Sequence, residues 1–319
     1  MKNLKFFFLG LLCMNLFLMT SCGSDDEDDM DDALDIVATA QATDDLSSLV
    51  AALERANLVS TLQGDGPFTV LAPNNAAFQT LLDGNTAWSS IEDIPVATLE
   101  TVLLYHVLGA DVKAADLSNS YVTTAATGPN DEQISLQIDV DGTVVTFNGI
   151  ANPLTTDIET TNGTVHIINN VMTPPTVVNH ALNSPQFSIL VDALTRSDHM
   201  TDFVDILSGD GPFTVFAPTN TAFAALLATN PDWGTLDDIP VETLDAVLKY
   251  HVINGTNAQS GNLSDAQVIP TFQGSDITID LSDGVNITTG AGQSIPVELA
   301  DVQGSNGVVH VIDEVLLFQ

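Results

Sequence analysis

Basic residues are scarce in this chain of 319 residues. It has six Lys and Arg against 42 Asp and Glu, which gives a formal net charge of −36. A surface this negative repels nucleic-acid backbones and anionic membrane surfaces, and it favours basic partners or polyvalent cations. The composition therefore excludes nucleic acid as an expected partner.

Cysteine is almost absent as well. The two cysteines, Cys13 and Cys22, both lie within the first 22 residues, so no disulfide is expected in the folded part. Two lysines at the start of the chain precede an apolar run from Phe6 to Met19. This order is typical of a secretory signal peptide and not of a membrane-spanning helix. We therefore assign residues 1–22 to a signal peptide.

The end of this segment, Leu18-Met19-Thr20-Ser21-Cys22, resembles the bacterial lipobox. The resemblance implies cleavage before Cys22 and attachment of acyl chains to this cysteine. Each buried methylene contributes about 0.8 kcal/mol to membrane binding, so three chains would hold the protein essentially permanently. The alternative is an ordinary signal peptide that is cleaved elsewhere, in which case Cys22 has no special role.

Residues 23–33 are dominated by acidic side chains. Seven carboxylates lie between Asp25 and Asp32 with one apolar residue among them, which predicts an extended, disordered tether. A calcium cage is the alternative, but it requires a glycine turn with alternating ligands. The acidic run beside Cys22 resembles the export signal that sends Bacteroidota lipoproteins to the outer face of the outer membrane. The predicted location is therefore the outer membrane, with the folded part anchored by lipid and exposed outside the cell.

Three segments occur twice in the same order. They are 64–78 and 209–223, 94–108 and 239–253, and 162–172 and 306–316. Repetition at a fixed spacing predicts a duplicated domain. The predicted copies are residues 34–173 and 177–319, and a proline-rich hinge at 174–176 separates them.

Within each copy, helical patterns come first. Leu46, Leu49 and Leu53 fall on one face of a helix that Asp44 or Asp45 can cap. The second copy repeats this apolar face, so the helix is expected in both.

Strand patterns come later in each copy. A short strand is predicted at 67–71, followed by a helix with Asn74 as its N-cap. Two strand-like segments then flank Asp141-Gly142, a typical hairpin turn, and Asp283-Gly284 has the same place in the second copy. Helices that gather early and strands that gather late indicate an α+β fold.

The repeated motifs identify a family resemblance. Residues 69–78 and 214–223, residues 163–172 and 307–316, and the pairs Tyr105-His106 and Tyr250-His251 resemble conserved parts of the fasciclin domain. Asn169 stands where this family usually has Asp, whereas Asp313 conforms to the family pattern. The resemblance covers residues 34–319 and implies two tandem fasciclin-like domains, each a β-sandwich-like core wrapped by helices. It also implies an adhesive role without catalysis.

Four histidines occur as repeat pairs, His106 with His251 and His166 with His310. Because each lies among Leu, Val and Ile, we interpret them as core histidines that are hydrogen-bonded to backbone or side chains, and we interpret Tyr105 and Tyr250 as structural. The alternative is a metal ligand or a general base. Zinc would need further ligands at close spacing, and the sequence has no HExxH or CxxC motif. No metal, cofactor or catalytic residue is therefore expected.

These features favour a non-catalytic adhesion protein. No GxSxG nucleophile motif occurs, and the expected partners are an extracellular matrix protein, a glycan or a second copy of the chain. Weak bridging by calcium between acidic surfaces is a further expectation. The alternatives are a glycan- or small-ligand-binding lipoprotein that serves an uptake system and a hydrolase with an unfamiliar site. Binding specificity is expected where the copies differ, in 109–134 and 254–276.

Overall fold

The computed structural model describes residues 33–319, which form one compact unit. The predicted signal peptide, Cys22 and the acidic run as far as Asp32 lie outside the described residues. Within residues 33–319, no helix is both long enough and apolar enough to cross a membrane.

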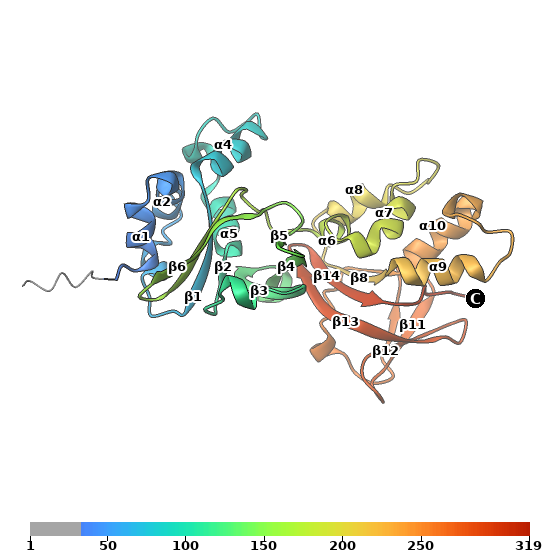
Figure 1. Ribbon diagram of the computed structural model, residues 1–319. Helices are drawn as coiled ribbons and strands as arrows, with labels where there is room; N and C mark the ends of the chain where they lie inside the picture. Colours follow the sequence, from blue (N-terminus) through green and yellow to red (C-terminus); the bar gives the residue numbers. More distant parts are fainter. Residues whose placement is uncertain (1–32) are drawn as a thin grey trace, which may run out of the picture. The chain divides into compact units, whose positions relative to one another are not determined.

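The first repeat begins with helices and ends with strands (Figure 1). Its helices are α1 (Ile36–Ala42), α2 (Ser47–Arg55), α3 (Val59–Leu62), α4 (Asn75–Asp83) and α5 (Val96–Tyr105). Its strands are β1 (Phe68–Pro73), β2 (Val107–Leu108), β3 (Ser120–Thr127), β4 (Gln133–Asp141), β5 (Val144–Phe147), β6 (Pro153–Thr160) and β7 (Gly163–Ile168). One sheet has the order β2-β1-β7-β6, in which β1 and β7 are parallel, and β3, β4 and β5 form an antiparallel sheet.

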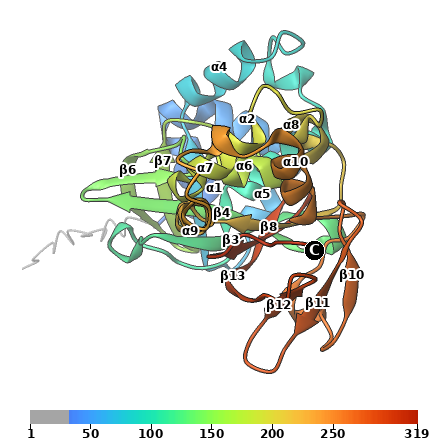
Figure 2. The same ribbon diagram turned by 90° about the vertical axis from the view of Figure 1, so that its right-hand side faces the viewer.

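The second repeat has the same order of elements, which confirms the predicted α+β class and its duplication. Its helices are α6 (Val177–Leu182), α7 (Ser188–Leu194), α8 (Phe203–Ser208), α9 (Asn220–Ala228) and α10 (Val241–Tyr250). Its strands are β8 (Phe213–Pro218), β9 (Val252–Asn254), β10 (Val268–Pro270), β11 (Asp276–Asp280), β12 (Asn286–Thr289), β13 (Ser294–Gly304) and β14 (Gly307–Ile312). Here all strands join in one sheet, β10-β11-β12-β13-β14-β8-β9, because the long β13 pairs with both β12 and β14. Figure 2 shows β10, β11 and β12 of this sheet next to one another.

Each repeat has two apolar layers. In repeat 1, Leu46, Leu53 and Phe78 from the helices pack against one side of the central sheet. Leu71 and Leu136 belong to a second cluster on the β3-β4-β5 side. Repeat 2 has two corresponding clusters, one under its helices and one around β11 and β12. Burial on both sides of the central strands explains why their sequences are almost continuously apolar.

The helix predicted after Asp44 is present and buries the predicted face, but the predicted cap is wrong. Residues 44–46 form a short 3-10 turn, and α2 has no side-chain bond from its own N-cap. Instead, the backbone N–H of Ser48 donates to Oδ1 of Asn75 at 2.8 Å, and Asn220 makes the equivalent bond in repeat 2 at 2.9 Å. Because the capping residue lies on another helix, local spacing could not identify it.

Other local predictions are confirmed. The backbone N–H of Ala77 donates to Oδ1 of Asn74 at 2.9 Å, so Asn74 caps α4 as expected. The strands β4 and β5 pair up to Asp141 and Val144, which closes the predicted hairpin. In repeat 2, β11 and β12 pair around a longer connection that contains Asp283-Gly284.

The segment predicted to be a hinge, 174–176, is bonded to repeat 2. The backbone N–H of Ser305 donates to the carbonyl oxygen of Pro175 at 2.7 Å. The side chain of Thr176 caps α6 by accepting from the backbone N–H of Asn179. These bonds tie the end of the linker to the β13–β14 turn.

Candidate binding surfaces

His106 and His251 end the helices α5 and α10 in the interior of each repeat. The Nδ1 of His106 lies 2.7 Å from the carbonyl oxygen of Val102, and the backbone N–H of Met172 donates to its Nε2 at 3.0 Å. His251 makes both contacts at the equivalent places, at 2.7 and 2.9 Å. The proton must therefore be on Nδ1, and neither nitrogen is free. Each ring joins its helix to the segment that follows the last strand of the repeat.

Burial lowers the pKa of both His106 and His251 to about 4. At neutral pH both rings are uncharged, because the buried environment penalises the imidazolium form. A general base or metal ligand needs an accessible lone pair, and here each Nε2 lone pair accepts a backbone N–H. These histidines are placed to hold the fold together and not to carry out chemistry.

His166 on β7 and His310 on β14 use the opposite tautomer. Their Nδ1 atoms accept from the backbone N–H of Asp157 at 3.1 Å and of Asp301 at 3.3 Å. Their Nε2 atoms donate to carbonyl oxygens at 2.9 Å in both repeats. Asp157 and Asp301 have positive φ angles of 59° and 63°. The rings therefore stabilise the left-handed residue at the irregular part of β6 and β13. Burial lowers the pKa of His310.

The two motif tyrosines are also bonded in the interior. The hydroxyl of Tyr105 donates to the carbonyl oxygen of Ser135 at 2.9 Å and accepts from Nδ2 of Asn148 at 2.7 Å. The hydroxyl of Tyr250 donates to the carbonyl oxygen of Asp276 at 2.8 Å. Burial raises the pKa of both phenols. The tyrosines thus connect helices to strands, His106 and His251 connect helices to the segment after the last strand, and His166 and His310 connect strands to neighbouring strands and loops. In residues 33–319 no group of three or more metal-binding side chains forms.

Asn162 and Asn306 occupy the tight turns before β7 and β14, and the sequence does not predict a structural role for them. The Oδ1 of Asn162 accepts from the backbone N–H of Ile36 at 3.0 Å, and its Nδ2 donates to the carbonyl oxygens of Leu62 at 2.7 Å and Gly64 at 2.9 Å. Asn306 makes the same three bonds in repeat 2. The only signal in the sequence is the Asn-Gly pair that both copies share.

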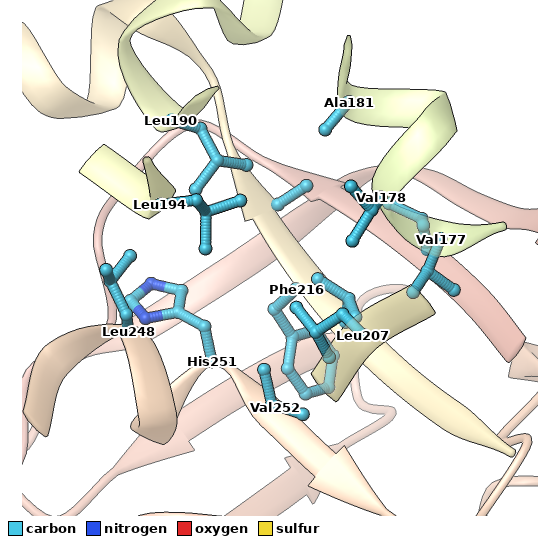
Figure 3. Close-up of a pocket in the computed structure, with 13 residues that line it drawn as sticks. Val177, Val178, Ala181, Leu190, Leu194, Leu207, Phe216, Leu248, His251 and Val252 are labelled. Carbon is cyan, nitrogen blue, oxygen red and sulfur yellow. The ribbon is translucent and has the colours of Figure 1, made fainter. Parts of the chain in front are cut away.

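An apolar cavity lies beneath the helices of repeat 2 (Figure 3). Val178, Leu190 and Leu248 line it together with the ring of His251. Its volume is about 20 Å³, room for about one water molecule, and a lining this apolar holds water poorly. We interpret it as a packing void and not as a ligand pocket.

Each of the four basic side chains in residues 33–319 is bonded within its own repeat. Arg55 donates to the carbonyl oxygen of Ile94 at 3.1 Å, and Arg196 donates to two carbonyl oxygens at 2.9 Å. Lys249 lies 2.6 Å from a carboxylate oxygen of Asp245, and the Nζ of Lys113 lies 3.5 Å from a carboxylate oxygen of Glu159. The exposed charge is therefore almost entirely carboxylate, which favours basic partners.

Repeat 2 presents three buried amide side chains to repeat 1, and we call Asn257, Gln259 and Gln303 the amide cluster. Asn257 donates to Oε1 of Gln303 at 3.1 Å, and Gln259 donates to the same oxygen. The backbone N–H of Gln303 donates to Oγ of Ser135, in repeat 1, at 3.0 Å. A Cβ at Gly128 would lie 2.6 Å from the carbonyl oxygen of Gly304, so glycine is required where the two backbones meet.

The equivalent surface of repeat 1 carries charge, and we call Asp111, Lys113 and Glu159 the charged cluster. The correspondence follows from the backbone, because Ala114 and Ser260 donate their N–H groups to the equivalent Asp157 and Asp301 at 2.8 and 2.7 Å. The Nζ of Lys113 lies 3.6 Å from Asp111 and 3.5 Å from Glu159. The exposed fraction of the side chain is 43% for Asp111, 33% for Lys113 and 81% for Glu159. No part of residues 33–319 covers them as repeat 1 covers the amide cluster.

Both halves of the chain match the model of the fasciclin domain, over residues 44–174 and 185–318. The chain therefore belongs to the fasciclin domain family.

The chain is also similar to individual proteins. The chain is 39% identical over 153 residues to the protein sll1483 of Synechocystis, a match that covers 44% of this chain and 73% of that protein. It is 27% identical over 277 residues to human periostin, which covers 86% of this chain and 30% of periostin. A solved fasciclin domain pair from the insect cell adhesion molecule fasciclin I covers 84% of this chain and 92% of that one, at 22% identity and a TM-score of 0.47.

Proposed function

We propose that this chain is a non-catalytic adhesion protein displayed on the outer membrane of a member of the Bacteroidota. The observation that carries the proposal is the pair of fasciclin domains whose repeated histidines are sealed in the core. A lipid on Cys22 and the acidic segment 23–33 would hold these domains outside the membrane. Because both nitrogens of His106 and His251 are bonded, the repeated motifs support a scaffold and not an active site.

The proposed partner is an extracellular matrix protein, a glycan or another copy of the chain. The scarcity of basic side chains on residues 33–319 makes basic surfaces attractive partners. Calcium could also bridge acidic surfaces of two molecules without a dedicated cage.

Deletion of the gene tests the adhesive function. Cells without the protein should attach less to surfaces or to each other, and the wild-type gene should restore attachment. A Cys22→Ala version should fail to restore it while the protein is still made, because the anchor is lost. Unchanged attachment and aggregation after deletion would contradict the proposal. A single strong soluble ligand in a thermal-shift screen, together with unchanged attachment of the deletion strain, would instead favour an uptake role.

A further inference from the structure

A groove lies between the two repeats, beside the contact of Ser135 with Gln303. Along β4 the side chains alternate, so that Gln137 and Asp139 lie on the face opposite the buried Leu136. The volume of the groove is about 660 Å³, which is large enough for a few sugar rings or a short peptide. Repeat 1 contributes Asn119, Tyr121, Gln137 and Asp139 to its lining, and repeat 2 contributes Gln186 and Leu299.

Gln137 is the unusual residue of this groove. It is 4% exposed, and its Nε2 donates to Oδ1 of Asp139 at 3.1 Å. Its Oε1 receives no hydrogen bond from any residue of the described chain. A buried amide oxygen without a donor is destabilising and rare in folded proteins, so it requires an explanation. Because this oxygen is closed off from solvent in the free chain, a ligand in the groove would have to shift the atoms that cover it before a donor of the ligand could satisfy it.

The other polar groups define the chemistry of that ligand. Oδ1 of Asn119 already accepts from the backbone N–H of Val140, which leaves its Nδ2 as a donor. Gln137 and Asp139 offer acceptors. A hydroxyl group both donates and accepts, whereas a guanidinium or ammonium group only donates. The carboxylate of Asp139 and the net charge of −36 oppose an anionic ligand. The exposed side chain of Leu299 adds an apolar wall.

We propose that this groove binds a neutral oligosaccharide, with Oε1 of Gln137 as the buried acceptor for a sugar hydroxyl. The inference rests on the proposed adhesive function, since it names a glycan as the partner. Because both repeats line the groove, it gives the tandem arrangement a role that a single domain could not fill.

The test uses the full chain and neutral gluco-, galacto-, manno- and xylo-oligosaccharides of two to six sugars. Isothermal titration calorimetry should find binding to at least one of these series. Gln137→Met keeps the side-chain length but removes the acceptor, and it should weaken binding by about tenfold or more. Its melting temperature should stay the same or rise, because an oxygen without a donor has been removed. Thr278→Val, at the equivalent place in repeat 2, should leave binding unchanged.

Three results would overturn the inference. They are no binding of any neutral series at millimolar concentration, binding that Gln137→Met leaves intact, and binding of a basic peptide such as hexaarginine in place of sugars. The adhesive function fails separately, when deletion of the gene leaves attachment unchanged although the purified protein binds the oligosaccharide.

Discussion

The amide cluster of repeat 2 and the charged cluster of repeat 1 occupy the same place in the same fold. Asn257, Gln259 and Gln303 are 6%, 9% and 2% exposed beneath repeat 1, whereas the side chain of Glu159 is 81% exposed. Moving a charged group out of water costs more free energy than moving an amide, unless the charge is fully paired. Contact between the repeats, and not the domain fold, therefore decides the chemistry of this surface.

The most destabilising change should be to place a carboxylate of repeat 1 at the equivalent position of repeat 2. Gln303→Glu should lower the free energy of unfolding by about 3–5 kcal/mol, because it buries an unpaired carboxylate. The side chain would also lose its bonds to the carbonyl oxygens of Gly304 and Gly307, at 2.8 and 3.0 Å. Urea unfolding measures the effect. The reverse change, Glu159→Gln, should have little effect, and equal losses in the two variants would refute the argument.

The turn asparagines, unlike the two clusters, have the same surroundings in both repeats. Asn162→Ala and Asn306→Ala each remove three hydrogen bonds and leave buried backbone groups without partners. Each should cost about 2–4 kcal/mol of unfolding free energy. Thermal and urea unfolding should give similar losses for the two. A loss confined to one repeat would show that the turns are not equivalent.

Acid should weaken both repeats through His106 and His251. Their folded pKa of about 4 lies below the ordinary 6.5, so the unfolded chain binds more protons between these values. The free energy of unfolding is therefore unaffected by these rings above pH 6.5. It falls as the pH is lowered towards 4, by at most about 1.4 kcal/mol per pH unit for each ring. Urea unfolding at pH 7, 6 and 5 measures this slope. His251→Gln should be less stable at pH 7 but should show a shallower slope, and an unchanged slope would exclude His251 as a source.

A substitution at Gly128 should destabilise the chain less, because it disturbs only the contact between this turn and Gly304. Gly128→Ala should cost about 1–3 kcal/mol, because the new methyl group overlaps the carbonyl oxygen of Gly304 and forces the backbones to shift. Gly109→Ala is the matched control, since a Cβ there meets no atom within 4 Å. Equal melting temperatures for the two variants would show that repeat 2 does not press against this turn.

The sequence predicts features that depend on neighbouring residues, such as the helix face of Leu46, Leu49 and Leu53 and the hairpin at Asp141-Gly142. The repeats themselves are visible because their motifs are long. The cap that Asn75 provides to α2 comes from another helix, so the residues near α2 in the sequence do not predict it. In the same way, the burial of the amides at 257, 259 and 303 cannot be predicted from the sequence, because repeat 1 covers them only in the folded chain. The groove at Gln137 could not be predicted either, because residues of both repeats line it. Part of it falls in 109–134, a region where the two copies differ.

Lys113, the cation of the charged cluster, should contribute little to stability. Lys113→Gln should change the melting temperature by about 2 °C or less, because an exposed ion pair contributes little and its loss leaves carboxylates in water. Even this change should shrink between 0.05 and 0.5 M NaCl, since salt screens exposed charges. Lys249→Gln should cost more and depend less on salt, because its partner Asp245 has a side chain only 10% exposed, at 2.6 Å. If Lys113→Gln proved the more damaging of the two, the charged cluster would have to be covered in solution, as the amide cluster is.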